Sequence, residues 1–161
     1  MLNMTRDKRL RLTFHRENDK AWNEIDRKSL YQTIRMLRLN KLAEVIKDAN
    51  TEKIRLTQKG KARWLEYQFN NLTLEKKKKW DKKWRIVLFD VPEEKKKVRD
   101  ALRRKLKKLG FLEFQKSVFV FPFPCHDEIN FVINFFDAEE YVYYIEAPIS
   151  PDTNLRKHFN L

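Results

Sequence analysis

Residues 82–122 read KKWRIVLFDVPEEKKKVRDALRRKLKKLGFLEFQKSVFVFP, and this stretch decides how the chain is expected to fold. Its apolar run at 85–89 predicts a short β-strand that ends at Asp90. A helix is expected next, over residues 95–109, because apolar side chains recur there at helical spacing and Gly110 supplies a C-terminal stop. The apolar positions of this helix are Val98, Leu102, Leu106 and Leu109.

The residues that follow continue the alternation of strands and helices. Residues 111–114 and 118–121 are expected to be strands, residues 127–137 a helix, and residues 141–147 a fourth strand of strong β character. The residues expected to face the core from the second helix are Ile129, Val132, Ile133 and Phe136. The order β-α-β-β-α-β predicts an α+β fold, a ferredoxin-like βαββαβ sandwich.

The first half of the chain predicts helices around a β-hairpin. A helix is expected after Asp26, a suitable N-cap, with one apolar stripe. That stripe consists of Leu30, Ile34 and Leu37. Two β-branched segments at 42–47 and 53–57 flank a turn-rich tetrapeptide, as in a hairpin. Thr57 is then expected to cap a further helix, whose inward residues are Ala62, Leu65 and Phe69.

A polar-faced helix followed at once by a hairpin is the order of a winged helix-turn-helix. A complete module has two helices ahead of the recognition helix, whereas only residues 1–26 precede it here. The sequence therefore predicts a truncated winged helix-turn-helix-like module. The alternative is a small helical cap whose charges are simply solvated.

The charge distribution favours a polyanionic partner. The formal net charge is +13, with +11 in residues 1–79, +7 in residues 80–110 and −5 in residues 111–161. Each Lys or Arg placed at a phosphate releases counterions. The basic residues 1–110 therefore favour binding to double-stranded DNA. The alternative is a basic protein with no role in nucleic-acid binding.

The residues expected to contact DNA come from three places. The first helix and the hairpin offer phosphate and base-edge chemistry, and the helix at 95–109 offers a basic, phosphate-facing surface. The predicted nucleic-acid-binding residues are Arg27, Lys28, Gln32, Arg35, Arg38, Lys53, Arg55, Lys95, Lys96, Arg99, Arg103, Arg104 and Lys107.

Asp90 has two interpretations. At the junction of a strand and a helix, an aspartate commonly accepts hydrogen bonds from the first free backbone N–H groups, and this capping role is favoured. The alternative is a Mg²⁺ ligand of a nuclease, with a two-fold partner supplying a second carboxylate. The three histidines are scattered, and Cys125, the only cysteine, excludes a disulfide and any multi-cysteine zinc site within one chain.

Residues 80–122 resemble the central domain of PaaX-type transcriptional repressors, the regulators of phenylacetate degradation. That domain in turn resembles the small ferredoxin-like CRISPR adaptation protein Cas2. The shared features are the strand into Asp90, the Asp-Val-Pro-Glu entry to a basic helix, and the pattern Gln115-x-Ser117-Val118-Phe119. The resemblance extends over about residues 80–149. The chain differs from PaaX proteins in its shortened N-terminal module and in lacking a further C-terminal domain, and from Cas2 in carrying residues 1–79.

The resemblance implies a DNA-binding dimer that represses transcription, often relieved by a small acyl-CoA ligand; the effector of this chain is not identified by its sequence. Cas2 proteins are dimers that hold duplex DNA during spacer capture, and some are metal-dependent nucleases. Their metal-binding aspartate matches Asp90. The expected function is therefore a PaaX-like repressor, and the alternative is a Cas2-type endonuclease or spacer-acquisition adaptor. DNA binding itself is expected to need no cofactor, and enzyme activity is not the favoured interpretation.

Three regions are expected: a winged-helix-like module at 1–70, a basic linker at 71–84 and the sandwich at 85–161. Phe131 and Phe135 lie off the apolar stripe of their helix, which indicates either a homodimer contact or a large core. No apolar run of 18 residues and no signal peptide are found, so a cytoplasmic protein without membrane attachment is expected.

Overall fold

The computed structural model describes residues 26–48, 51–75 and 79–161. The chain divides into two compact units, residues 1–67 and 68–161, and the division falls within one helix. Each unit is described by itself. The segment at 1–25, on which the truncation of the first module was judged, lies outside the described residues, as do 49–50 of the hairpin turn and 76–78 of the linker.

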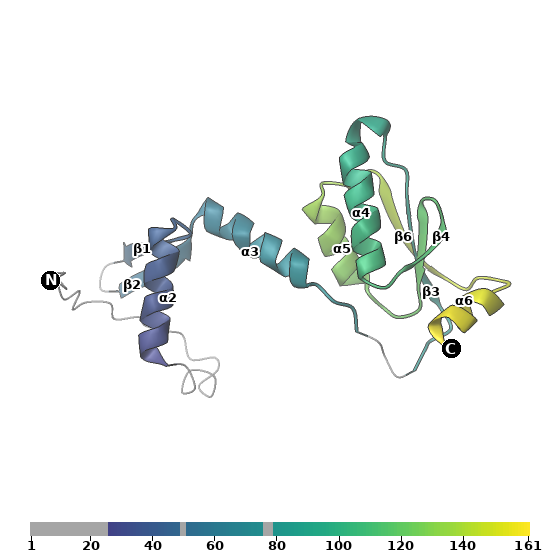
Figure 1. Cartoon of the computed structure of the whole chain (residues 1–161), viewed down its shortest axis with the longest axis horizontal. Coiled ribbons are helices and arrows are strands. Elements are labelled where there is room, and N and C mark those ends of the chain that lie inside the picture. The colour runs from purple at the N-terminus through teal and green to yellow at the C-terminus, as the bar shows by residue number, and fades with distance from the viewer. Residues whose placement is uncertain (1–25, 49–50, 76–78) are drawn as a thin grey trace. The chain divides into compact units, whose positions relative to one another are not determined.

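The first unit contains a helix, a hairpin and the beginning of a second helix (Figure 1). Helix α2 (Arg27–Leu39) starts at Asp26, whose carboxylate accepts hydrogen bonds from the backbone N–H groups of Lys28 and Ser29, as an N-cap should. Strands β1 (Ala43–Asp48) and β2 (Thr51–Leu56) pair antiparallel, from Ala43 opposite Leu56 to Asp48 opposite Thr51. Helix α3 (Gln58–Asn71) follows directly.

Thr57 and Gly60 fix the start of α3 against the chain that enters the hairpin. The Thr57 hydroxyl accepts a hydrogen bond from the Gly60 N–H at 3.0 Å and donates one to the Lys41 carbonyl at 2.7 Å. A Cβ atom on Gly60 would lie 1.9 Å from the Leu42 carbonyl oxygen. Position 60 therefore requires glycine because of this close backbone approach, and the capping role predicted for Thr57 is confirmed.

Two inward positions predicted for α3 are wrong. Ala62 is exposed, and Leu65 is 45% exposed. Phe69, the third, does pack inward, against the core of the second unit. The helical spacing identified an apolar stripe, but its first half has no packing partner among the described residues of the first unit.

The second unit has the predicted order of elements, β-α-β-β-α-β, followed by one more helix. Its elements are β3 (Trp84–Phe89), α4 (Lys96–Lys108), β4 (Leu112–Gln115), β5 (Val118–Phe121), α5 (His126–Phe135), β6 (Val142–Ala147) and α6 (Thr153–Phe159). A short 3-10 turn, Glu93–Lys95, leads into α4. Helix α6 was not predicted.

The four strands of this unit form one antiparallel sheet in the order β4-β5-β3-β6. Central strand β3 pairs with β5, from Arg85 opposite Phe121, and with β6, from Trp84 opposite Ala147. The β4–β5 pairing is irregular at Glu113 and Gln115. Strands β4 and β6 form the two edges. The chain is thus a mixed α+β protein with antiparallel sheets.

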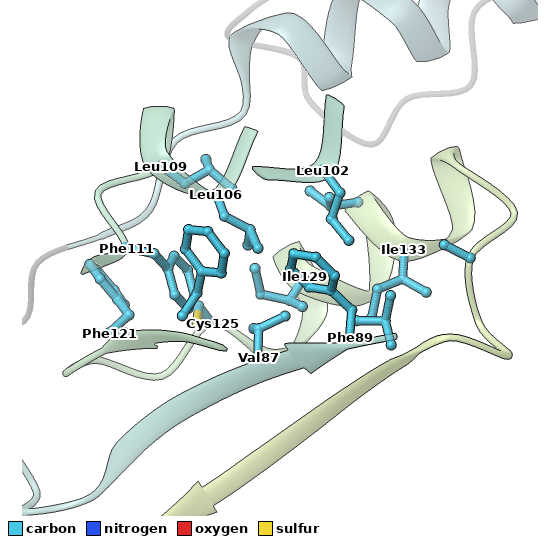
Figure 2. Packing of buried hydrophobic residues seen from close by; sticks show 14 of the residues in the cluster. Val87, Phe89, Leu102, Leu106, Leu109, Phe111, Phe121, Cys125, Ile129 and Ile133 are labelled. Carbon is cyan, nitrogen blue, oxygen red and sulfur yellow. The ribbon is translucent and has the colours of Figure 1, made fainter. Parts of the chain in front are cut away.

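Helices α4 and α5 cover one face of the sheet. Val87 and Phe89 of β3 point into a core that receives Leu102 and Leu106 from α4 and Ile129 from α5 (Figure 2). Each of these side chains is at most 3% exposed. The apolar stripes predicted for both helices are confirmed, because their residues supply this core.

A smaller cluster lies on the alternate positions of the sheet. Trp84 is fully buried and packs with Val120 of β5 and Leu155 of α6. The Trp80 ring lies 4.8 Å from the Trp84 ring, centre to centre, and Phe159 of α6 lies 5.8 Å away. Helix α6 therefore closes part of the second face, and the two tryptophans pack against it.

Phe135 contacts another aromatic residue of its own chain. Its ring is 37% exposed and stacks on Phe69, with the ring centres 4.0 Å apart and the planes 11° apart. Of the two interpretations of Phe135, this contact favours the extended core. Among the described residues, no helix combines the length and the apolar character needed to cross a bilayer.

Candidate nucleic-acid interface

Helix α2 presents polar side chains because one buried residue orients it. Ile34 is 6% exposed and holds the helix against its unit. The four predicted contact residues of this helix with described side chains are all exposed, namely Lys28, Gln32, Arg35 and Arg38. The side chain of Arg27 lies outside the described residues. The cluster offers cations and an amide, groups that bind phosphates and base edges.

The hairpin contributes fewer uncompensated cations than its sequence indicated. Arg55 of β2 forms an ion pair with Glu44 of β1, with Nη2 2.8 Å from Oε1. Lys53 is exposed. Because Arg55 and Glu44 face each other across the two strands, the pair has little net charge.

A hollow of about 260 Å³ lies at the base of the hairpin. Its lining is Glu44, Arg55, Leu56, Thr57, Gln58 and Lys61. Three of its polar residues are already engaged, since Glu44 pairs with Arg55 and Thr57 bonds to the Lys41 carbonyl. Its other polar residues, Gln58 and Lys61, are exposed.

Helix α4 carries a row of cations that form ion pairs with two glutamates. Glu93, just before the helix, lies 3.6 Å from Lys96 Nζ and 2.9 Å from Arg99 Nη1. Glu113 of β4 lies 3.7 Å from Arg103 Nη2 and 2.5 Å from Lys107 Nζ. Hydrogen bonds from Arg99 and from Lys107 lower the pKa values of Glu93 and Glu113 respectively, so both glutamates hold their negative charge.

The two remaining predicted residues of this region behave differently. Lys95 Nζ lies 4.7 Å from the centre of the Tyr141 ring, a cation–π contact. Arg104 is exposed and has no ion-pair partner within the described part of the chain. The structure thus brings six predicted cations onto or beside one helix, but their electrostatic surroundings are unequal.

Lys105 is the buried member of the basic residues of α4. It is 5% exposed, and its ammonium group donates a hydrogen bond to the Phe69 carbonyl. Burial lowers its pKa, with the nearby charge of Lys108 acting in the same direction. Its position between Val98 and Leu109 on the buried side of the helix was the signal available in the sequence.

Asp90 does not cap the helix. Pro92 occupies the N-cap of the turn that follows, and no side chain caps it. The backbone N–H of Asp90 donates to the Tyr141 carbonyl at 2.9 Å, while its side chain is exposed. No group of three or more Asp, Glu, His or Cys residues gathers among the described residues. Asp90 therefore offers a single exposed carboxylate at the end of β3.

The buried Arg85 forms an ion pair with the exposed Asp81, which the sequence analysis missed. The guanidinium of Arg85 is 2% exposed and makes two 2.6 Å hydrogen bonds to the Asp81 carboxylate. It also donates to the Pro122 carbonyl at 3.0 Å. The Arg85 hydrogen bond lowers the pKa of Asp81 to about 2. The spacing Asp-x-x-x-Arg was the available signal.

Cys125 and His126 do not form a reactive pair. Cys125 is 2% exposed, and burial raises the pKa of its thiol to about 12, so the thiolate is disfavoured. His126 is exposed and lies beside Asn130 and Asp127 of its own helix.

The fold and this surface define a class: an antiparallel α+β sandwich with a strongly basic helix, preceded by a helix and a hairpin. A family model described as the PaaX protein central Cas2-like domain matches residues 77–158, which is 82 of the 161 residues. The chain therefore belongs to the PaaX family, as its sequence predicted. A search of curated proteins found no match.

Proposed function

We propose that this chain is a PaaX-like transcriptional regulator that binds double-stranded DNA as a homodimer and represses transcription. The observation that carries the proposal is the capped helix α2, which exposes Lys28, Gln32, Arg35 and Arg38 and runs directly into a hairpin. The match to the PaaX central domain supports it. Such a regulator acts in the cytoplasm and requires no cofactor for DNA binding.

The finer interpretation of the first unit is a winged helix-turn-helix-like module. In such a module α2 enters the major groove and the β1–β2 hairpin lies along the phosphate backbone. Lys53 and Arg55 of the hairpin are both exposed, and Arg55 must separate from Glu44 before it pairs with a phosphate. The competing interpretation is a helical cap with solvated charges. Substituting Arg35 and Arg38 by alanine distinguishes the two interpretations. The substitution should abolish the preference for one DNA sequence only if the first unit is a winged helix-turn-helix-like module.

The finer interpretation of the second unit is a ferredoxin-like, Cas2-like sandwich. Its element order and its sheet order β4-β5-β3-β6 support this classification. The proposed dimer buries the part of the sheet that α6 leaves uncovered. Tyr143 and Ile145 of edge strand β6 alternate with the inward Val142 and are 59% and 44% exposed. Two copies packed through these apolar side chains would exclude water from both.

The test is a gel shift at physiological salt, with labelled DNA from upstream of the protein's own gene. Excess random duplex and Mg²⁺ are present, and parallel samples are run denatured. A discrete shifted band that survives competitor, with intact strands, is the expected result. A shift that random duplex abolishes would replace the regulator with an adaptor that binds DNA without sequence preference.

The second candidate function is a Cas2-type Mg²⁺-dependent endonuclease or spacer-acquisition adaptor. The observation that favours it is the exposed carboxylate of Asp90 at the end of β3. A complete site would need carboxylates from a second copy. Strands that are shortened only with Mg²⁺, and remain intact with the variant Asp90→Asn, would establish the nuclease and overturn the regulator as the main activity.

A further inference from the structure

The outward face of α4 carries cations that form no ion pair with the described chain. Successive residues of a helix turn by about 100°, so Lys97, Arg104 and Lys108 fall on one side, opposite the buried Leu102. All three are exposed. Lys97 and Arg104 have no ion-pair partner among the described residues. Lys108 donates to the backbone carbonyl of Asn70 at 3.3 Å, and that neutral acceptor leaves its charge uncompensated.

A second row of cations on the same helix is held by the protein itself. Its members are Lys96, Arg99, Arg103 and Lys107, of which the first two pair with Glu93 and the last two with Glu113. The side chains of the two arginines are only 23% and 22% exposed. Arg103 also donates to the Lys116 carbonyl. Two glutamates thus halve the net charge of this row and orient it toward the protein.

We infer that the outward row, formed by Lys97, Arg104 and Lys108, is the part of α4 that contacts DNA phosphates. The inference rests on the proposed DNA-binding function and specifies the face that carries it. Two of these residues, Lys97 and Lys108, are not among the residues predicted from the sequence. The cations of the other row are engaged in ion pairs with Glu93 and Glu113 within the second unit.

The physical reason for choosing the outward row lies in how a protein gains affinity for a polyanion. Affinity for duplex DNA comes mainly from counterions released when uncompensated protein cations replace them at phosphates. A lysine already paired with a glutamate must lose that pair before it gains a phosphate. With a rise of about 1.5 Å per residue, the row from Lys97 to Lys108 extends roughly 16 Å along the helix. Phosphates follow each other about every 3.4 Å along the axis of one strand, so three separate contacts fit.

The test measures the salt dependence of binding for the whole chain. A fluorescently labelled 30-base-pair duplex of random sequence is titrated at several salt concentrations by anisotropy. For the wild type, the logarithm of the binding constant falls linearly with the logarithm of salt concentration. Lys97→Gln and Arg104→Gln should each reduce the slope by about 0.9 and weaken binding several-fold at constant salt.

Two neighbouring lysines provide matched controls. Lys96→Gln and Lys107→Gln remove the same charge from the same helix, at side chains that are 61% and 56% exposed, and should leave the slope unchanged. Thermal unfolding of each variant, followed by circular dichroism, establishes that all remain folded.

The outcomes separate this inference from the proposed function. Control variants that reduce the slope as much as Lys97→Gln would place DNA on the second row and overturn the inference. Unchanged slopes for Lys97→Gln and Arg104→Gln would overturn it as well. A wild-type chain that binds no duplex, or that polyglutamate displaces more readily than unlabelled duplex, would remove the DNA-binding function itself.

Discussion

Lys105 of α4 caps the end of α3 through Phe69. Its ammonium nitrogen lies 4.3 Å from the centre of the Phe69 ring and donates a hydrogen bond to the Phe69 carbonyl. The last carbonyls of a helix have no partner within that helix, and a cation placed there is favourable. Lys108 donates in the same way to the Asn70 carbonyl. The last turn of α3 is therefore part of the second unit, held by charge as well as by packing.

Replacing Phe69 by alanine should lower the free energy of unfolding of the second unit by about 2–3 kcal/mol. The ring is partly buried and contacts Phe135 and Phe136, so the loss falls below that of a fully buried phenylalanine. Urea unfolding followed by tryptophan fluorescence measures it. Phe114→Ala, at a side chain that is 48% exposed, is the matched control and should cost less than about 1 kcal/mol. Equal losses would mean that Phe69 does not anchor the helix.

Lys105 should make the second unit more stable as the pH rises toward 10.5. Burial lowers its pKa below the usual 10.5, so the unfolded chain binds more protons at this site between the two values. The contribution of Lys105 to the free energy of unfolding therefore increases as the pH rises through the pKa that Lys105 has in the folded chain. Urea unfolding of the wild type and Lys105→Met at pH 7 to 10.5 checks this. The difference between the two proteins should shift in favour of the wild type, whereas a constant difference would contradict the burial of the charged amine.

The Asp81–Arg85 pair should make the fold sensitive to acid. The pKa of Asp81 is about 2 in the folded chain against a usual 3.8, so its stabilisation is present above pH 4 and is lost as the pH falls toward 2. Asp81→Asn removes the nearer of the two carboxylates that pair with the buried Arg85, and leaves Glu146 at 3.5 Å from Nε. Because Asp81 is itself 44% exposed, the expected loss at pH 6 is a discounted ~1–3 kcal/mol.

The measurement is chemical unfolding of the wild type and of Asp81→Asn at pH 6, 4 and 2.5. The two proteins should converge in stability as the pH falls. Glu139→Gln, at an exposed acidic position, serves as the control and should follow the wild type. A difference that stays constant down to pH 2.5 would mean that the pair does not titrate in this range.

The helices and strands of the second unit could be predicted from the sequence because they bury regular apolar stripes. Leu102, Leu106, Ile129 and Val132 recur at helical spacing and all reach the core. Helix α6 was missed because only Leu155 and Phe159 face inward, too few positions to make a periodic pattern. The resemblance to a known family carried the rest of the identification.

Only part of the candidate site could be predicted, because a sequence shows which residues are charged but not which residues surround them in the fold. Nothing local to residues 95–108 shows that Glu113, from another strand, neutralises Lys107. Likewise, a lysine on an apolar stripe, such as Lys105, can either extend its ammonium group to solvent or bury it. Lys105 is buried because the Phe69 carbonyl at the end of α3 accepts its hydrogen bond. Leu65 was misplaced for a related reason, since a stripe does not identify what it packs against.

Gly60→Ala should destabilise the first unit, although alanine favours helices by about 0.5–1 kcal/mol. The added Cβ would lie 1.9 Å from the Leu42 carbonyl oxygen, a backbone atom, so the start of α3 and the hairpin must separate. A cost of at least ~1–3 kcal/mol is expected. Circular dichroism and limited proteolysis measure it, with Lys61→Ala, an exposed neighbour, as control. A more stable Gly60→Ala protein would show that this close approach does not exist in solution.

Ile145→Lys should convert the proposed dimer into a monomer. Ile145 is 44% exposed on edge strand β6, and a lysine facing its own copy across a two-fold axis would bring two like charges into an apolar contact. The dissociation constant should rise roughly 100-fold, which corresponds to about 2.7 kcal/mol. Sedimentation equilibrium at several concentrations measures it. Glu139→Lys adds positive charge outside this sheet and should leave the dimer unchanged. If Ile145→Lys remains a dimer while Glu139→Lys dissociates, the second copy binds elsewhere, and the uncovered face of the sheet has another role.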